Sequence, residues 1–245
     1  MSKETGGLKN LKILSIDTTC NTCQVALTDG RKLLGSYSEN DRRTHSVKLL
    51  PAIENIVKEA GLEPSDIDLL AVTNGPGSYT GMRIGVSTAK AIAYGTGAPL
   101  VGVNTLDFLA FSSARSLRSK KISHVCAIIN ARNERVYSCI YDRDLVPLRA
   151  CHAGDLKDVC EELSSLLSDG KKVLFCGDGS VDYKEQIEEY LPEKAVFSPK
   201  EIILGDAKVI NDLAEKIYRG SDDKSEFSAE KLTIEYLRPY LREDK

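Results

Sequence analysis

The glycine-rich segment TNGPGSYTGMRIG, residues 73–85, is where the backbone of this chain could come closest to an anion. It follows the apolar run DLLAV, so we expect a turn from a buried strand into a helix, which is a place where proteins bind phosphates. A Walker loop has a lysine after its last glycine, where this chain has Met82. The glycines at 75, 77 and 81 have one residue too many for the dinucleotide fingerprint. We therefore interpret the segment first as a packing device.

The helix expected after this turn, up to about Gly97, carries small residues on broad surfaces. Gly81 and Gly85 lie one turn apart, and a glycine inside a helix costs roughly 1 kcal/mol relative to alanine, so it needs a reason. We expect these two glycines to allow intimate contact between this chain and another polypeptide. An anion site at the same loop is the weaker alternative.

Asp17 is the carboxylate best placed to hold a metal-bound water, because it ends the first expected strand, KILSIDTT. The turn that follows contains neither glycine nor lysine, and a tight triphosphate cradle needs close approach of backbone N–H groups. A satisfied hairpin, with Asp17 capping the turn, is the simpler interpretation.

The equivalent turn in the second half of the chain has Asn130 where a carboxylate is expected, in the segment INARNERVY. The later segment FCGDGSVDY follows a strand and could approach a nucleotide, although a strand-end turn explains it more simply. The residues that could remain from a nucleotide site are Asp17, Thr18, Thr19, Gly75, Gly77, Gly177, Asp178 and Gly179.

The histidines and cysteines are not spaced for a metal site or a nucleophile. His45 is followed four residues later by Leu49, so a two-histidine helical clamp is missing. Cys20 and Cys23 form a C-x-x-C pair, but no second pair follows at zinc spacing, and a redox or zinc role is the minor alternative. Ser78 lacks the flanking glycines of a nucleophile elbow. We expect no catalytic residue, no metal and no cofactor.

The composition is that of an ordinary globular protein, with 245 residues, of which 42% are hydrophobic and 28% charged. A net charge of −3 gives the chain no general attraction for polyanions, which argues against nucleic-acid binding by the chain alone. Seven irregularly spaced cysteines in apolar stretches indicate a reducing compartment. No apolar run reaches the length of a spanning helix, so we expect a cytoplasmic protein with no membrane contact.

The element pattern predicts an α/β fold of two duplicated lobes, at residues 11–113 and 122–245, joined by the linker SSARSLRSKK. Each lobe begins with a three-strand meander and continues with alternating helices and strands, so each should be a mixed sheet flanked by helices. The tail of the second lobe could return to the first. Two lobes of this order resemble the actin-like (ASKHA, ribonuclease H-like) superfold of actin, hexokinase and the DnaK-type chaperones.

The segments ILSIDTTCNTCQVAL, RTHSVKLLPAIENIV, NGPGSYTGMRIGVSTAKAIAYG and PLVGVNTLDFLA together resemble the bacterial TsaB (YeaZ) family. The resemblance implies a role in making threonylcarbamoyladenosine at position 37 of tRNA. It implies partnership with the catalytic paralogue TsaD and the ATPase TsaE, contact with tRNA through the complex, and a homodimer when the paralogue is absent. In that paralogue two histidines four apart bind metal, where this chain has His45 and Leu49.

The first two helices, residues 44–61 and 79–97, are expected at the contact with the paralogue. The resemblance implies this contact, and the helix at 44–61 has an apolar arc wider than one lobe requires, since Leu49, Ala52 and Ile56 add to a stripe at 47, 50, 53, 57 and 60. A helix wedged between two sheets is the alternative explanation of that arc. The expected interface residues are His45, Leu49, Ile53, Ile56, Val57, Gly81, Met82, Arg83, Gly85, Val86 and Ala89.

These expectations lead to the hypothesis of a non-catalytic scaffold that binds and activates TsaD. An enzyme acting alone, either an ATPase that uses Asp17 or a peptidase, is the alternative. Direct binding of tRNA by the isolated chain is a third hypothesis, and it predicts an affinity that falls steeply with salt.

Overall fold

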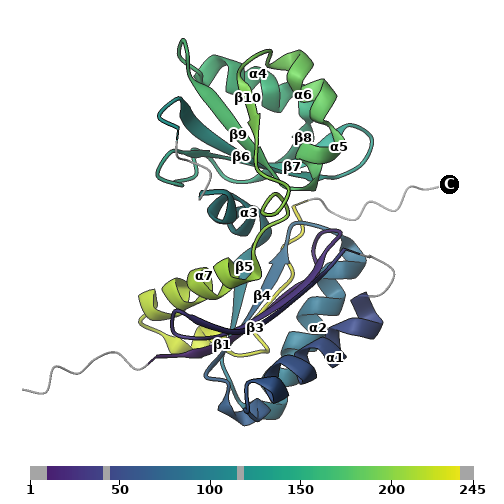
Figure 1. Ribbon diagram of the computed structural model, residues 1–245, viewed down its shortest axis with the longest axis vertical. Coiled ribbons are helices and arrows are strands. Elements are labelled where there is room, and N and C mark those ends of the chain that lie inside the picture. The colour runs from purple at the N-terminus through teal and green to yellow at the C-terminus, as the bar shows by residue number, and fades with distance from the viewer. Residues whose placement is uncertain (1–9, 41–44, 115–118, 238–245) are drawn as a thin grey trace, which may run out of the picture.

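The computed structural model describes residues 10–40, 45–114 and 119–237, which form two lobes that are each built around a five-stranded sheet (Figure 1). The first lobe contains β1 (Lys12–Asp17), β2 (Cys23–Asp29), β3 (Lys32–Glu39), α1 (His45–Glu59), η1 (Pro64–Asp66), β4 (Leu69–Gly75), α2 (Tyr79–Thr96), β5 (Leu100–Asn104) and α3 (Thr105–Ser113). The second contains β6 (Ile122–Asn130), β7 (Arg135–Asp142), β8 (His152–Asp155), α4 (Leu156–Leu166), β9 (Lys172–Cys176), α5 (Asp178–Asp182), α6 (Lys184–Tyr190) and β10 (Ala195–Phe197). The chain continues into α7 (Ala207–Gly220) and η3 (Lys224–Phe227).

The two sheets have the same strand order. The first is β3-β2-β1-β4-β5, and the second, read in the equivalent direction, is β8-β7-β6-β9-β10. In each sheet an antiparallel meander of three strands opens the lobe, and two parallel strands are added beside the first strand of the meander. The predicted fold class, two duplicated actin-like lobes with mixed sheets, is therefore confirmed.

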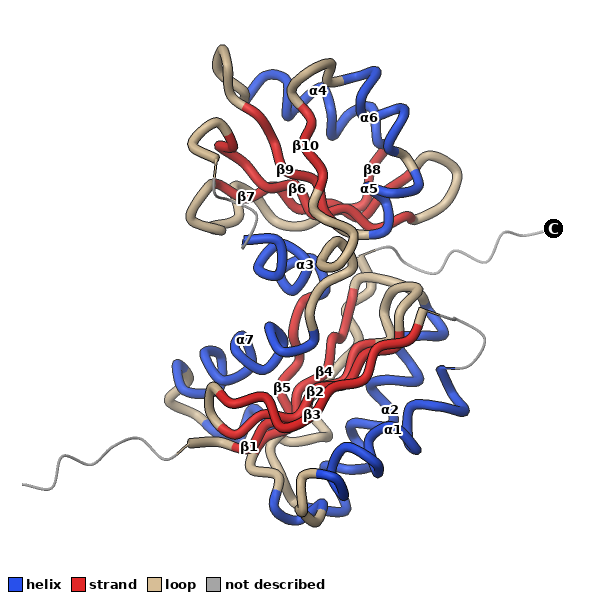
Figure 2. Tube along the Cα trace, viewed as in Figure 1, coloured by secondary structure: helices blue, strands red, loops and turns tan. Residues whose placement is uncertain are grey.

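Helices α1 and α2 cover one face of the first sheet (Figure 2). Alternation along β1 sends Leu14 and Ile16 into the core beneath these helices and Ile13 into the core on the opposite face. Helix α2 begins where predicted, since the Ser78 hydroxyl accepts a hydrogen bond from the Gly81 N–H at 3.3 Å. Residue 44, where we expected α1 to begin, lies outside the described residues.

Helix α7 packs on the first lobe, on the face of the sheet opposite α1 and α2. The sequence pattern places this helix in the second lobe, residues 122–245, of which the tail could return to the first. The Asn211 side chain donates to the Ile13 carbonyl at 2.9 Å and to the Thr28 hydroxyl at 3.0 Å, and the Ser15 hydroxyl donates to the Ala207 carbonyl at 3.1 Å. The physical reason is that both faces of the second sheet are already covered, one by α3 and the other by α4, α5 and α6, whereas this face of the first sheet is not.

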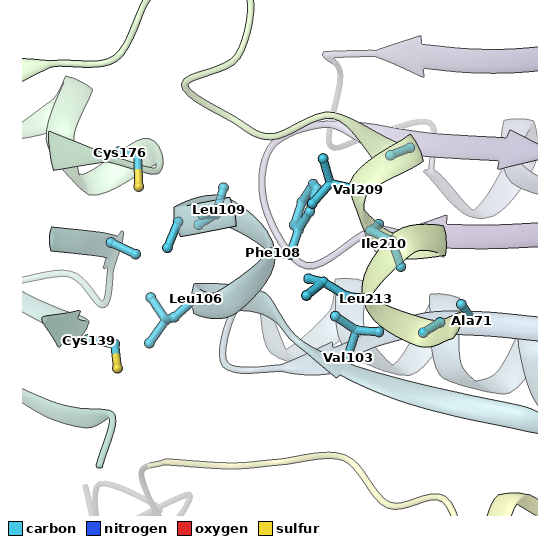
Figure 3. Packing of buried hydrophobic residues seen from close by; sticks show 14 of the residues in the cluster. Ala71, Val103, Leu106, Phe108, Leu109, Cys139, Cys176, Val209, Ile210 and Leu213 are labelled. Atoms are coloured by element: carbon cyan, nitrogen blue, oxygen red, sulfur yellow. The ribbon is translucent and has the colours of Figure 1, made fainter. Parts of the chain in front are cut away.

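Helix α3 lies between the two sheets and joins the lobes through one hydrophobic core (Figure 3). Leu106 and Leu109 point toward the second sheet, and Phe108 points toward α7. Phe108 is fully buried, and the connection to α7 passes so close that a side chain at Gly205 would collide with its ring. The linker predicted after α3 includes residues 115–118, which lie outside the described residues.

Two details of the second lobe differ from the expectation. The segment after β9 forms the short helix α5 where we expected only a strand-end turn. The third strand of the meander begins only at His152, because residues 143–151 form a loop after β7. In that loop the Leu148 N–H donates to the Ile140 carbonyl at 2.9 Å.

Candidate functional site

A hollow of about 290 Å³ lies between the lobes, at the ends of the central strands. It is lined by Thr19, Gly77, Ser78, Tyr79 and Thr80 from the first lobe and by Ile129, Asn130, Ala131, Arg132, Tyr137 and Asp178 from the second. The two halves of the predicted nucleotide site therefore face one another. Thr19, Gly77 and Asp178 reach the hollow, whereas the other five predicted residues are buried behind it.

Asp17 is fully buried at the end of β1 and holds the turn that follows. Its Oδ1 accepts hydrogen bonds from the Thr19 N–H at 3.0 Å, the Thr19 hydroxyl at 2.6 Å and the Thr73 hydroxyl at 2.5 Å. Its Oδ2 is buried and has no hydrogen-bond partner among the described residues. Burial raises the pKa of Asp17, and the hydrogen bonds from Thr19 and Thr73 only partly offset this effect. The carboxyl thus acts as a structural group that does not touch the hollow.

The glycine loop packs against the carbonyl groups of that same turn. A side chain at Gly81 would collide with the Thr18 carbonyl oxygen, and one at Gly77 would collide with the Thr19 carbonyl oxygen. The Ser78 N–H donates to the Thr19 carbonyl at 2.7 Å, and the Thr18 hydroxyl donates to the Gly81 carbonyl at 2.7 Å. These contacts hold the start of α2 directly on the β1–β2 turn.

The expectation that Gly81 and Gly85 allow contact between separate polypeptides is therefore wrong. The neighbour of both glycines is Thr18 of the same lobe, whose hydroxyl oxygen occupies the space that a Gly85 side chain would need. The interpretation of close packing was correct, but the packing occurs within the chain. A helix can approach the carbonyl groups of the turn this closely only where its surface has no side chains.

This packing decides what the first-lobe turn offers to a ligand. A phosphate clasp presents backbone N–H groups. Here the Thr19 N–H is bound by Asp17, and the carbonyls of Thr18 and Thr19 face the glycine loop. The turn therefore lacks the free donors of a phosphate cradle at these positions.

The second-lobe turn is closed in a similar way. A side chain at Gly177 would collide with the Ile128 carbonyl, and Asp178 Oδ1 accepts from the Asn130 N–H at 3.0 Å. Asn130 Oδ1 in turn accepts from the Arg132 N–H at 2.7 Å and the Tyr183 hydroxyl at 2.9 Å. Asn130, the departure noted in the sequence, shapes the turn through its own side chain.

The residues predicted to form the partner interface are, with one exception, buried within the first lobe. Arg83 is exposed, and its guanidinium lies 4.1 Å from the centre of the Tyr79 ring. The buried ones are His45, Leu49, Ile53, Ile56, Val57, Gly81, Met82, Gly85, Val86 and Ala89. They are buried because one apolar side of each helix packs on the sheet, and these residues form that side. For example, the His45 Nε2 atom lies 3.3 Å from the carbonyl oxygen of Asn21.

The side chains that these helices present to solvent form what we call the outer α1–α2 face. It consists of Val47, Leu50, Pro51, Ile84, Ser87, Thr88, Ala91 and Gly95, all exposed or half-buried. Val47 is 72% exposed and Leu50 49%, although the predicted apolar stripe contained both. A hollow of about 620 Å³ between α1, η1 and Ile92 of α2 adjoins Leu50. The sequence shows the small residues of α2, but it does not show which side of α1 faces the sheet.

The C-x-x-C pair shows no sign of reactivity. Cys20 and Cys23 are buried and form no disulfide in the described part of the chain, and burial raises the pKa of Cys23 to about 12. Within residues 10–40, 45–114 and 119–237, no three His, Cys, Asp or Glu side chains gather as metal ligands would. None of the helices in this part of the chain combines the length and the apolar character needed to cross a membrane.

Comparison with known proteins places these features in one family. The family model of TsaD, tRNA N6-adenosine threonylcarbamoyltransferase, matches residues 32–223. TsaB of Bacillus subtilis, a tRNA threonylcarbamoyladenosine biosynthesis protein, is 30% identical over 184 residues, which cover 75% of this chain and 78% of that protein. A tRNA N6-adenosine threonylcarbamoyltransferase of Anaeromyxobacter dehalogenans is 34% identical over 112 residues, covering 39% of this chain and 34% of that protein. The structure of YeaZ from Pseudomonas aeruginosa is 26% identical, covers 93% of this chain and 100% of that one, and has a TM-score of 0.73.

Proposed function

Because this chain belongs to the TsaB family of tRNA threonylcarbamoyladenosine biosynthesis proteins, we propose that it is a non-catalytic scaffold subunit that binds and activates the transferase TsaD. The share of each relative that the match covers supports this role for the chain. The similarity extends over 78% of the Bacillus subtilis TsaB but only 34% of a transferase. In this role the chain and TsaD together form the surface that TsaE and the tRNA meet, and the free chain pairs with itself.

The observation that carries the proposal is the closed turn after β1. Asp17 is buried and its neighbouring carbonyls are covered by the glycine loop, so the group best placed for nucleotide chemistry is used to hold the fold. An ATPase acting through Asp17, the main alternative, needs this carboxylate to reach a bound metal or water. The geometry gives that alternative no support.

The outer α1–α2 face is the surface that we propose for TsaD. Contiguous exposed apolar side chains on a protein of this size mark an interaction surface more often than a free one. The exposed Val47 and Leu50 are large, whereas Ser87, Ala91 and Gly95 are small enough to let another helix approach closely. Nothing within 4 Å would meet a side chain added at Gly95, so this part of α2 is open.

The test is to place a charge on this face without disturbing the lobe. Val47→Glu should weaken TsaD binding, measured by titration calorimetry with the purified full chain, by at least about tenfold, because a carboxylate in a closed apolar contact loses its hydration. Val146→Glu is the matched control, since Val146 is 55% exposed but lies in the second lobe. Equal affinity for TsaD in the two variants would remove the proposal.

A further inference from the structure

Arg83 lies at one end of the outer α1–α2 face, in a row of exposed residues along α2. The residues of this row follow one another at intervals of four, which places them on one side of the helix. The row consists of Tyr79, Arg83, Ser87, Ala91 and Gly95, all of them exposed. Arg83 is the charged member of the row, and the three residues after it are small. A cation therefore borders the surface proposed for TsaD.

Two aromatic side chains hold the guanidinium of Arg83 in place. It lies 4.1 Å from the centre of the Tyr79 ring, within the distance of about 6 Å at which a cation is attracted to a ring face. Its Nε–H donates a hydrogen bond to the Tyr236 hydroxyl at 3.3 Å. The two tyrosine rings lie beside each other, with their centroids 5.7 Å apart. The contacts with both rings restrict the motion of the guanidinium.

Tyr236 comes from the segment after η3, which is itself bound to the first lobe. The Glu235 N–H donates to the Asn74 carbonyl at 2.8 Å, and the Asn74 side chain donates to the Thr233 carbonyl at 3.1 Å. The Glu235 carbonyl lies so close to Gly75 that a side chain at this glycine would collide with it. These backbone contacts hold the Tyr236 hydroxyl beside α2.

Most of the hydrogen-bond donors of Arg83 are unused. A guanidinium has five N–H donors, of which the Nε–H is bound to Tyr236. Within the part of the chain that the structure describes, no carboxylate forms an ion pair with Arg83 and no group accepts a hydrogen bond from its two terminal nitrogens. A guanidinium binds a carboxylate through two parallel N–H donors, and a fork that is already held in place loses less entropy on binding.

We propose that Arg83 binds a carboxylate of the partner on the outer α1–α2 face, that is, an Asp or Glu side chain of TsaD, and that Tyr79 and Tyr236 are positioning residues for it. This inference rests on the proposed function and adds the chemistry that the partner presents. A carboxylate fits better than an RNA phosphate, because the chain has a net charge of −3 and the row on α2 contains no second cation. Nucleic acids are bound by several cations together.

The experiment measures binding of the purified full chain to purified TsaD by titration calorimetry at several salt concentrations. Arg83→Ala should bind about tenfold more weakly at low salt, because it leaves the carboxylate of TsaD without a partner in the contact, and its affinity should depend less on salt. Arg83→Lys keeps the charge but not the fork, so it should restore only part of the affinity. Arg31→Ala, which removes an exposed arginine from the turn between β2 and β3, is the matched control and should bind as the wild type does.

The positioning role of Tyr236 needs a measurement that depends on Arg83. Tyr236→Phe keeps the ring and removes the hydroxyl, and it should weaken binding by about twofold to threefold, because the guanidinium loses one of its two contacts. The same change made in the Arg83→Ala variant should have no further effect, since the residue that it positions is absent. An equal loss in both backgrounds would overturn the positioning role.

The failure of this inference can be distinguished from the failure of the proposed function. If Val47→Glu weakens TsaD binding but Arg83→Ala has the affinity and salt dependence of the wild type, the carboxylate contact is overturned and the scaffold role stands. If neither variant changes TsaD binding, both are overturned. Fluorescence anisotropy of labelled tRNA with the isolated chain tests the other anion. Salt-sensitive tRNA binding that Arg83→Ala abolishes, together with unchanged TsaD binding, would assign Arg83 to a phosphate and overturn the proposal.

Discussion

In the first lobe two long helices, α1 with 15 residues and α2 with 18, cover the outer face of the sheet. In the second lobe the same face carries α4, α5 and α6, with 11, 5 and 7 residues. The strand order beneath them is identical. The long helices border the hollow of about 620 Å³ and present a stripe of small residues. The duplication has thus kept the sheets alike while the outer helices diverged, and this divergence makes the first lobe the better surface for a partner helix.

The two lobes also share a way of joining a helix to the end of the first strand. Gly81 lies against the Thr18 carbonyl, and Gly177 lies against the Ile128 carbonyl, in each case after the fourth strand of the lobe. The strand ends differ in charge, since β1 ends in the buried carboxyl Asp17 and β6 in the amide Asn130. The glycines therefore belong to the common frame, whereas a carboxyl at the end of the first strand is particular to the first lobe.

Removing the Phe108 ring from the core between the lobes should have the largest effect on stability. Phe108→Ala deletes a fully buried ring between α3 and α7, which should lower the free energy of unfolding by about 3–5 kcal/mol in urea denaturation. Phe111→Ala, on the same helix but half-buried, should cost clearly less. Equal losses in the two variants would show that the core between the lobes does not depend on Phe108.

Substituting the glycines tests the shared packing against the carbonyl groups. Gly81→Ala forces a methyl group onto the Thr18 carbonyl and should cost about 3 kcal/mol of stability, because backbone must move. Gly179→Ala, whose added carbon would lie 3.1 Å from the Ile128 oxygen, should cost about 1 kcal/mol. Gly95→Ala in α2 is open to solvent and should stabilise by up to ~1 kcal/mol. A Gly81→Ala protein as stable as Gly95→Ala would contradict the contact that defines the site.

The charge difference between the strand ends predicts a pH dependence. Because burial raises the pKa of Asp17 in the folded state above the usual value of 3.8, the folded chain holds this proton longer than the unfolded chain. The free energy of unfolding should therefore fall, relative to that of Asp17→Asn, as pH rises above 3.8, by at most ~1.4 kcal/mol per pH unit, and level off above the folded pKa.

Urea denaturation at several pH values measures this difference. The exposed Asp169, changed to Asn, is the control for removing a carboxylate at the surface. A wild-type chain that gains stability over Asp17→Asn as pH rises would mean that the native carboxylate is favoured by its hydrogen bonds, and it would reverse our interpretation of the turn.

Much of the fold could be predicted from local signals. The Asp29-Gly30 hairpin, the buried run at Leu69–Gly75 and the limits of α2 all follow from turn chemistry and periodicity. The docking of α7 could not, because its apolar stripe shows that it covers a sheet but not which one. The short helix α5 was missed because five residues do not reveal a helical period.

The candidate site shows a different limit of the sequence. Spacing shows that Gly81 and Gly85 need a close neighbour, but it does not say whether that neighbour belongs to the same chain. In α1, apolar residues occur on more than one side, so the sequence did not reveal that Leu49 is buried while Val47 is exposed.

The most direct test is formation of threonylcarbamoyladenosine on tRNA in a cell extract that contains TsaD and TsaE but lacks this chain, to which the wild-type chain or either of two variants is added. We predict that Asp17→Asn supports modification as well as the wild type does, and that Val47→Glu supports little. A mixture in which Asp17→Asn is inactive while Val47→Glu is fully active would contradict the central claim, since it would place chemistry at the turn and no partner on the outer α1–α2 face.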